Sequence, residues 1–195
     1  MKMSKSTIGI IVAVVLVCLW AAGAYNSMVG EQENATTALA NVQSTYQRRA
    51  DLIPNLVETV KGYASHEKET LEGVVNARSK ATQITLDPEN MTPEKLQEYQ
   101  KAQGELGAAL GRLIAISESY PDLKANENFR DLQVQLEGTE NRINEARNKY
   151  NTAVQNYNVT IRSFPKNLLA GMFGFQKMNK FEAEAGAEKA PKVKF

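Results

Sequence analysis

The stretch from Leu39 to Ile84 decides the fold and reads LANVQSTYQRRADLIPNLVETVKGYASHEKETLEGVVNARSKATQI. Steps of three and four alternate along it and trace one seam of mostly apolar residues. The seam keeps its phase at Pro54, although a loop would have no reason to preserve it. We therefore predict one long helix over residues 30–84, kinked near Pro54. The seam consists of Leu39, Val42, Tyr46, Arg49, Ile53, Leu56, Val60, Tyr63, Glu67, Thr70, Val74, Ala77, Ala81 and Ile84.

A different reading of the same stretch stays open. Asp51 is a suitable N-cap for a new helix that tolerates Pro54 in its first turn. In that case the first helix is broken at Pro54, and the soluble part has four long helices instead of three.

The prolines define two further helices. Thr92 is a suitable N-cap with Pro93 at the first helical position, and a seam from Leu96 to Tyr120 ends before Pro121. A third seam consists of Phe129, Leu132, Leu136, Thr139, Ile143, Ala146, Tyr150, Ala153, Tyr157, Thr160 and Phe164. No stretch alternates with a period of two over a useful length, so the soluble part is predicted to be all-α.

Short connections set the predicted architecture. Residues 87–91 and 120–122 leave room only for a reversal of direction, which predicts an elongated antiparallel up-down bundle. The length of 195 residues favours a single core. Gly104, Gly107 and Gly111 lie near one face of the second helix, where we expect them to permit close approach of a neighbouring helix.

An uncharged segment precedes the bundle. Residues 8–24 read IGIIVAVVLVCLWAAGA, and as a helix they cover roughly 25 Å, the short end of a membrane span. Trp20 and Tyr25 lie where an aromatic belt forms. We predict a short basic N-terminus at residues 1–7 and a transmembrane anchor at residues 8–25.

Two other interpretations of this segment stay open. Ala22-Gly23-Ala24 resembles the small residues before a signal-peptidase site, in which case the anchor is cleaved. Cys18 is the residue that a lipoprotein would acylate, although Val17 is not the small residue that such a signal requires.

Positive charge near the span predicts its orientation. Lys2 and Lys5 precede it, whereas the first basic residue after it is Arg48. This distribution predicts a plasma-membrane protein with a cytoplasmic N-terminus and a bundle outside the cytoplasm, in the periplasm where the cell has one.

The remaining residues divide into a bundle and a tail. Residues 26–175 form the predicted helical bundle. An apolar cluster around residues 168–175 is either a short fourth helix or a cap on the bundle. Residues 176–195 are rich in Lys, Glu and Ala and are predicted to be a flexible tail.

Composition excludes several classes of function. The 23 basic and 22 acidic residues give a net charge of +1, so nucleic acid is not an expected partner. One Cys and one His cannot build a disulfide framework or the usual zinc site. The zinc-protease pattern that His66-Glu67 begins fails at Thr70. We expect no cofactor and no bound metal.

Two charged residues on the first seam need partners. Arg49 and Glu67 occupy positions that are normally apolar, and a buried charge is costly unless it is paired. Each should find a partner or lie where the seam opens. An enzyme hypothesis would use Glu67, Glu140 or His66, and it requires a deep pocket where these residues converge.

Four strings resemble the LemA family. They are RRADLIPNLVETVKGYASHE at 48–67, ESYPDLKANENF at 118–129, TENRINEARNKYN at 139–151 and the pair Tyr157-Asn158, and the resemblance covers residues 25–175. It implies a transmembrane helix followed by an antiparallel bundle, with no established catalytic residues. Members of the family are often found alongside membrane metallopeptidases, and a relative takes part in organising magnetosome membranes, so the resemblance implies an accessory or organising role.

The sequence therefore favours a non-enzymatic, single-pass membrane protein that presents its bundle as a scaffold or adaptor. Its expected partners are the bilayer, through residues 8–25, and other proteins whose identity the sequence does not give. Two alternatives are an accessory regulator of a membrane protease and a membrane-remodelling or lipid-contacting protein. Homo-oligomerisation stays open.

Overall fold

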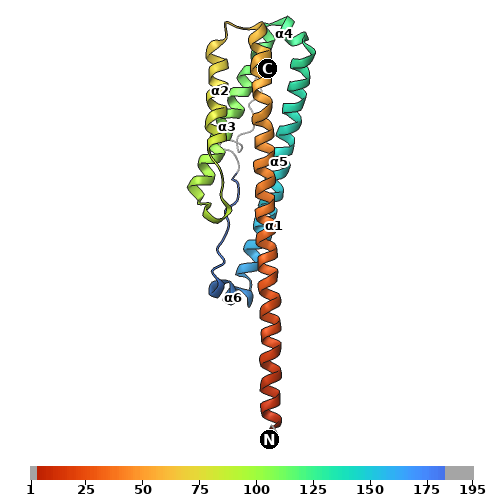
Figure 1. Ribbon diagram of the computed structural model, residues 1–195, viewed down its shortest axis with the longest axis vertical. Coiled ribbons are helices and arrows are strands. Elements are labelled where there is room, and N and C mark those ends of the chain that lie inside the picture. Colours follow the sequence, from red (N-terminus) through yellow and green to blue (C-terminus); the bar gives the residue numbers. More distant parts are fainter. Residues whose placement is uncertain (1–3, 183–195) are drawn as a thin grey trace, which may run out of the picture. The chain divides into compact units, whose positions relative to one another are not determined.

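The computed structural model describes residues 4–182, and within that range the chain is all-helical with no strand (Figure 1). Its elements are α1 (Lys5–Tyr63), α2 (Lys68–Gln83), the 3-10 turn η1 (Pro88–Asn90), α3 (Pro93–Ile116), the 3-10 turn η2 (Ser117–Ser119), α4 (Pro121–Ala125), α5 (Glu127–Arg162) and α6 (Lys166–Phe173). The predicted fold class is therefore confirmed at the level of an all-α chain with a long apolar N-terminal helix.

The contacts divide the chain into two compact units. The first unit contains the residues up to Ser44 together with Asn144–Met178, and the second contains Thr45–Ile143 together with the residues from Asn179. Helices α1 and α5 contribute residues to both units. This division differs from the single core expected from chain length, and each unit has its own cluster of buried apolar side chains.

Helix α1 passes through Pro54 without a break, so the reading in which a new helix starts there is wrong. Proline has no amide hydrogen, and the carbonyl of Ala50, four residues earlier, therefore loses its helical donor. Arg78 of α2 replaces that donor, since its Nε lies 2.8 Å from the Ala50 oxygen. Because Ala50 is buried, an unpaired carbonyl there would be costly.

The first helix ends at Tyr63, so the prediction of one helix up to Ile84 is wrong. A turn follows, closed by a 3.1 Å hydrogen bond from the Glu67 amide to the Ala64 carbonyl, and α2 begins directly after it. Within the second unit, α2 lies beside the last turns of α1 (Figure 1). A constant seam phase therefore did not distinguish one helix from two helices joined by a short turn.

Burial in α2 explains why the chain turns. Leu71 and Val74 are buried in the same cluster as Leu56 and Val60. A continuous helix would carry the two α2 side chains away from that cluster by 1.5 Å per residue. The buried residue at the start of α2 is Leu71, not the predicted seam residue Thr70.

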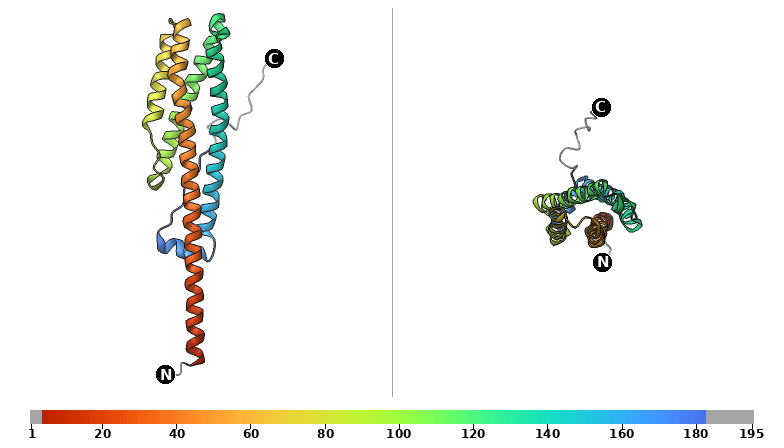
Figure 2. Two further views of the ribbon diagram at one scale, coloured as in Figure 1. Left: turned by 45° about the vertical axis from the view of Figure 1, so that its right-hand side comes forward. Right: turned by 90° about the horizontal axis from the view of Figure 1, so that it is seen from above.

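Helix α3 begins as predicted and packs against α2 (Figure 2). The Thr92 hydroxyl accepts a 3.3 Å hydrogen bond from the amide of Lys95, and Pro93 occupies the first turn. A backbone hydrogen bond at this helix start, aided by Thr92, lowers the pKa of Glu94. The predicted seam residues from Leu96 to Leu113 are buried.

The glycines of α3 do not have the role predicted for them. A Cβ placed on Gly104 or Gly111 would meet no atom within 4 Å. A Cβ on Gly107 would meet Nη1 of Arg49 at 3.7 Å, an ordinary contact. Close approach by a neighbouring helix is therefore not what these glycines provide in the described part of the chain.

The buried side of α5 shifts along the helix. Tyr150 and Tyr157 are buried as predicted, whereas Val154 and Ile161 are buried in place of Ala153 and Thr160. A straight α-helix drifts by about 20° per heptad relative to an exact seven-residue repeat. Residues chosen by an exact seven-residue repeat therefore move gradually out of the buried side along a long helix.

The apolar start of α1 is exposed. Among residues 4–182, α1 is the one helix long and apolar enough to cross a membrane, and 6% of its most apolar 18-residue window is buried. Cys18, inside this segment, is a free and exposed cysteine. Side chains of this kind find a stable environment in lipid, so the segment supports membrane localisation.

The apolar cluster after Pro165 contains the short helix α6. Its Ala170 is buried together with Met28 of α1 and with Tyr157 and Ile161 of α5, all within the first unit. Gly174 ends the helix in the left-handed conformation, with φ of 76°.

Residues after α6 make defined contacts, in contrast to the flexible tail predicted from residue 176. The Tyr157 hydroxyl donates a 2.9 Å hydrogen bond to the Gln176 carbonyl. The Asn158 side chain donates to the Met178 carbonyl at 2.9 Å and accepts from its amide at 3.0 Å. Phe181 is buried. The rest of the predicted tail, residues 183–195, lies outside the described residues.

Candidate functional site

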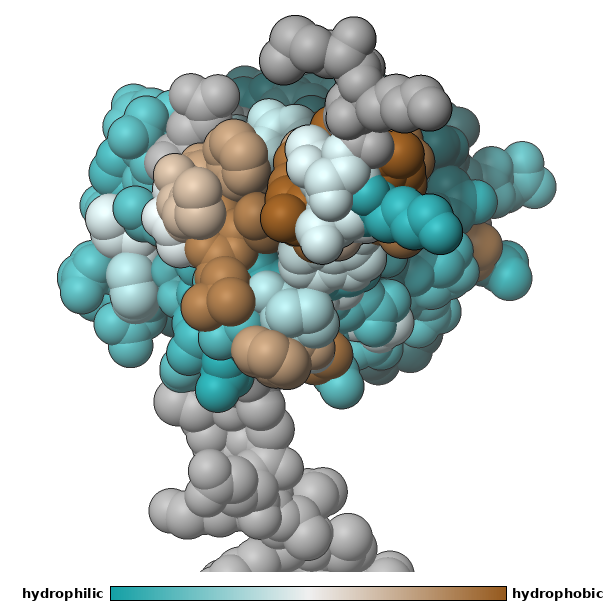
Figure 3. Space-filling view, turned by 90° about the horizontal axis from the view of Figure 1, so that it is seen from below, coloured by the Kyte–Doolittle hydropathy of each residue, from teal (hydrophilic) through white to brown (hydrophobic). Residues whose placement is uncertain are grey.

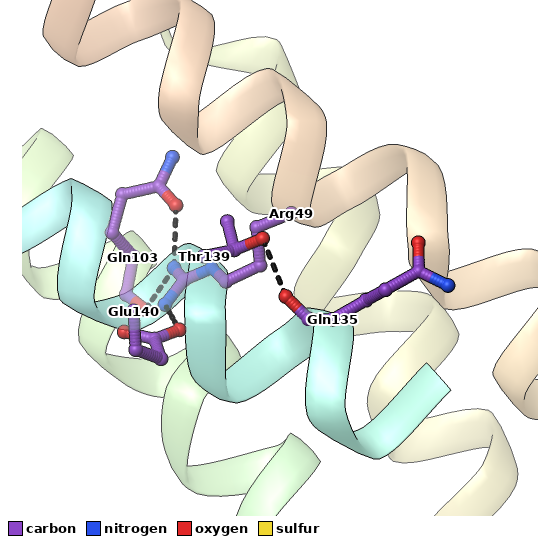
Figure 4. A network of polar contacts seen from close by, with 5 residues as sticks. All are labelled: Arg49, Gln103, Gln135, Thr139 and Glu140. Atoms are coloured by element: carbon purple, nitrogen blue, oxygen red, sulfur yellow. Dashed lines mark hydrogen bonds and ion pairs between the residues drawn. The ribbon is translucent and has the colours of Figure 1, made fainter. Parts of the chain in front are cut away.

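A buried arginine links three helices of the second unit (Figure 4). Arg49 of α1 is 3% exposed. Its Nη1 donates a 2.7 Å hydrogen bond to Oε1 of Glu140 on α5. Its Nη2 donates to the backbone oxygen of Gln103 on α3 at 2.9 Å and to the Oε1 of the same residue at 2.8 Å. The planar guanidinium fork suits several acceptors at once, and the predicted partner for Arg49 is confirmed.

Gln103 extends this network to a fourth helix. Its Nε2 donates a 3.2 Å hydrogen bond to the carbonyl oxygen of Ala81 on α2. The nearby Thr139 hydroxyl donates to the Gln135 carbonyl of its own helix at 2.7 Å. Gln103 lies on the predicted seam of the second helix and Thr139 on that of the third, and no role was predicted for either. A polar residue on an apolar seam was the signal that would have found both.

Two tyrosine rings lie next to each other beside Arg49. The Cζ of Arg49 lies 5.1 Å from the centroid of the Tyr46 ring, a cation–π distance. Tyr46 and Tyr99 meet edge to face, with centroids 5.4 Å apart. Burial, and then the neighbouring Tyr46, raise the pKa of Tyr99 well above its ordinary value. Tyr99 therefore keeps its proton at neutral pH.

The Arg49 guanidinium forms its ion pair through Nη1, with Glu140. Glu140 keeps 47% of its side chain exposed, so water reaches that end of the ion pair. Among the described residues, the Nε of Arg49 is a buried side-chain nitrogen without a hydrogen-bond partner. Arginine does not lose its proton in proteins. The arrangement therefore links the three helices, and Arg49 itself does not act as an acid or a base.

Glu67, the second seam charge, also has a partner. It lies in the turn after α1 and accepts a 3.1 Å hydrogen bond from the hydroxyl of Tyr120. This hydrogen bond raises the pKa of Tyr120 above its ordinary value. The contact ties the turn after α1 to the residue that precedes α4.

The three residues of the enzyme hypothesis are not brought together. Glu140 binds Arg49, Glu67 binds Tyr120, and His66 lies exposed in the turn between α1 and α2. No group of three or more His, Cys, Asp or Glu side chains suited to a metal ion occurs in residues 4–182.

An open groove of about 730 Å³ lies between the end of α1 and α2. None of the three enzyme candidates lines it. Its apolar part includes Val57, Leu71 and Val75, of which Val75 is exposed. The polar part contains Ser65 and Asn76 together with charged side chains of both signs, which are Glu58, Lys61, Lys68 and Glu72.

The strings that carried the resemblance have structural roles. In LIPNLV, Ile53 and Leu56 are fully buried, and Pro54 creates the unpaired carbonyl that Arg78 caps. In YPDL, Leu123 is fully buried.

Other residues of the same strings cap the start of α5 and contact the segment after α6. Asn126 begins α5, since its side-chain oxygen accepts a 2.9 Å hydrogen bond from the Phe129 amide. The Tyr157 and Asn158 side chains form hydrogen bonds with the backbone of Gln176 and Met178, respectively.

These features define a class of all-helical proteins in which an N-terminal apolar helix precedes a polar, helical remainder. The particular family follows from comparison with known proteins. The LemA family model matches residues 38–195, and the chain belongs to that family. The match continues beyond residue 175, where the sequence resemblance had been expected to stop.

Similar proteins include two magnetosome proteins. Magnetosome protein MamQ of Magnetospirillum gryphiswaldense is 26% identical over 180 residues, which are 83% of this chain and 66% of the relative. MamQ 2 of Paramagnetospirillum magneticum is 26% identical over 181 residues, 84% of this chain and 66% of the relative.

A third relative carries the family's name. Protein LemA of Metamycoplasma hominis is 26% identical over 121 residues, 62% of this chain and 52% of the relative. The chain therefore spans slightly less than two thirds of the magnetosome relatives and about half of this one.

We expect Glu140→Ala to lower the free energy of unfolding by about 2 kcal/mol, because Arg49 stays buried without its counter-ion. Chemical denaturation of the detergent-solubilised full chain, followed by circular dichroism, measures this loss. The matched control is Glu145→Ala on the same helix, whose 2.6 Å pair with Lys149 is exposed at both ends. The control should leave the unfolding midpoint nearly unchanged. Equal shifts for the two variants would contradict a special role for Glu140.

Proposed function

We propose that the chain is a non-enzymatic, single-pass membrane protein whose helical domain serves as a scaffold or adaptor for other membrane-associated proteins. The observation that carries this proposal is the continuity of α1. One helix contains both the exposed apolar segment and the seam that is buried in the helical domain. The buried Arg49 and Gln103 side chains are engaged in links between helices, which supports a structural function over a chemical one.

The relatives support the membrane setting. Two of them are named magnetosome proteins, and the chain belongs to the LemA family. The chain covers 66% of the length of MamQ. The role in organising membranes that the family resemblance implies is therefore part of our proposal.

We place residues 8–25 in the plasma membrane, with residues 26–175 as an antiparallel bundle outside the cytoplasm. Lys2 and Lys5 before the span, and the lack of a basic residue after it until Arg48, support this orientation. The continuity of α1 favours a retained anchor over a cleaved one, because the apolar segment continues into a helix of the domain.

The groove between α1 and α2 is the surface at which we expect a partner protein. Its apolar lining fits the apolar stripe of a partner's helix, and its lysines and glutamates offer ion pairs to either charge. A lipid-contacting function is a second candidate, favoured by exposed apolar residues on α6.

A photo-crosslinking residue in place of Val75, in the groove, should capture a defined partner in intact membranes. The matched control is Val134, an exposed valine on α5 that is absent from the groove lining. Charge reversal by Lys61→Glu with Lys68→Glu should weaken the Val75 adduct. The proposal would fail if both positions gave the same scattered set of neighbours.

Protease treatment of spheroplasts tests the orientation. A carboxyl-terminal tag should be digested in intact spheroplasts, because the domain is placed outside the cytoplasm. A tag protected until lysis would reverse the orientation, and a tag released into the soluble fraction would show that the anchor is cleaved.

A further inference from the structure

Helix α6 is apolar on the side that faces away from its own cluster. Phe164 just before the helix is 82% exposed, and Leu168 and Met172 are 61% and 77% exposed. The opposite side of the helix is occupied, because Ala170 is buried and Leu169 packs against the same cluster. Several large apolar side chains exposed together mark an interaction surface.

Aromatic contacts place this surface beside the end of the apolar segment of α1. The Tyr25 ring lies 4.9 Å from that of Phe173 and 5.7 Å from that of Phe175, both in edge-to-face geometry. Ala24, the last residue of the apolar segment, is only 5% exposed. The chain around α6 therefore packs beside the end of the segment at Tyr25.

A polar contact also joins α6 to α1, two residues after Tyr25. The Nζ of Lys166, the first residue of α6, lies 3.1 Å from the hydroxyl of Ser27. All of these residues belong to the first unit.

The sequence of α1 locates the edge of the bilayer. No charged residue occurs between Lys5 and Glu31. A hydrocarbon core of about 30 Å requires about 20 helical residues, so Tyr25 falls near one boundary of the bilayer. Tyrosine also prefers that boundary. A helix in contact with Tyr25 consequently lies at the level of the headgroups.

The charge of this part of the chain suits anionic headgroups. Residues 146–178 contain no Asp or Glu. Their basic residues are Arg147, Lys149, Arg162, Lys166 and Lys177. Arg162, Lys166 and Lys177 are the ones close to α6 in the sequence, and basic residues beside exposed apolar side chains are the combination that binds an anionic membrane surface.

We propose that residues 164–175 form a membrane foot, which inserts its exposed apolar side chains into the headgroup layer next to the point where α1 leaves the bilayer. Hydrophobic side chains gather on this end of the molecule, seen along α1 from its first residues (Figure 3). The occupant is the anionic bilayer itself, since the contacts with Tyr25 hold the foot at its boundary. This inference rests on the membrane span that the proposed function assumes.

Fluorescence quenching by lipid tests the foot in the full chain. An environment-sensitive fluorophore is attached to Met172→Cys in a Cys18→Ala background, and the protein is reconstituted into vesicles of phosphatidylcholine and phosphatidylglycerol in equal amounts. Leu16→Cys reports on the span, and Val134→Cys, exposed on α5, is the control outside the foot. Leu168→Cys provides a second probe of the foot.

Spin-labelled lipid should quench the Met172 and Leu168 probes at least about twofold more than the Val134 probe, and a shallow label should act more strongly than a deep one. Quenching of Leu16 without quenching of the foot probes would overturn the foot and leave the span intact. A Leu16 probe that is not quenched would overturn both. Disulfide-linked dimers through Met172→Cys, with no quenching, would assign the surface to a second copy and also overturn the foot.

Discussion

The packing of the second unit depends on two arginines that bind groups on neighbouring helices. Pro54 leaves the Ala50 carbonyl without its helical donor, and Arg78 supplies a donor from α2. Arg49 is buried and needs acceptors that α1 does not provide, and Glu140 is one of those that α3 and α5 supply. Hydrogen bonds tolerate only a few tenths of an ångström in distance, so these links fix the register of four helices more narrowly than apolar packing does.

Most of the helices could be predicted from the sequence, and the reasons for the misses are physical. Seam periodicity and the Thr92 cap depend on residues close in sequence, so the start and the buried side of α3 were predicted correctly, although the helix ends at Ile116 and residues 117–119 form the 3-10 turn η2. The end of α1 at Tyr63 depends on where Leu71 becomes buried, which is a tertiary contact that periodicity does not contain. The sequence predicted that Arg49 needs a partner. It did not predict that the partner is Glu140, because that contact depends on how α5 packs against α1. Arg78 was missed because its acceptor exists only as a consequence of Pro54.

Glu140 and Glu67, two of the three residues of the enzyme hypothesis, are engaged in contacts between neighbouring elements of the second unit. Glu140 binds Arg49 and Glu67 binds Tyr120, which leaves the open groove lined mainly by apolar and surface charged groups. Membership of the LemA family and the apolar start of α1 add a membrane setting to this helical framework. A protein of this construction is suited to present surfaces near a bilayer, and the groove and α6 offer two such surfaces of different chemistry.

The most direct test of this account is a double-mutant cycle on Pro54 and Arg78. Arg78→Met removes the donor to the buried Ala50 carbonyl and should cost about 1–2 kcal/mol of unfolding free energy. In a Pro54→Ala background the amide of residue 54 can donate to that carbonyl, so the same change should cost about 1 kcal/mol less. Chemical denaturation of the four proteins measures the coupling. An equal cost of Arg78→Met in both backgrounds would contradict the claim that buried polar links between helices hold this fold.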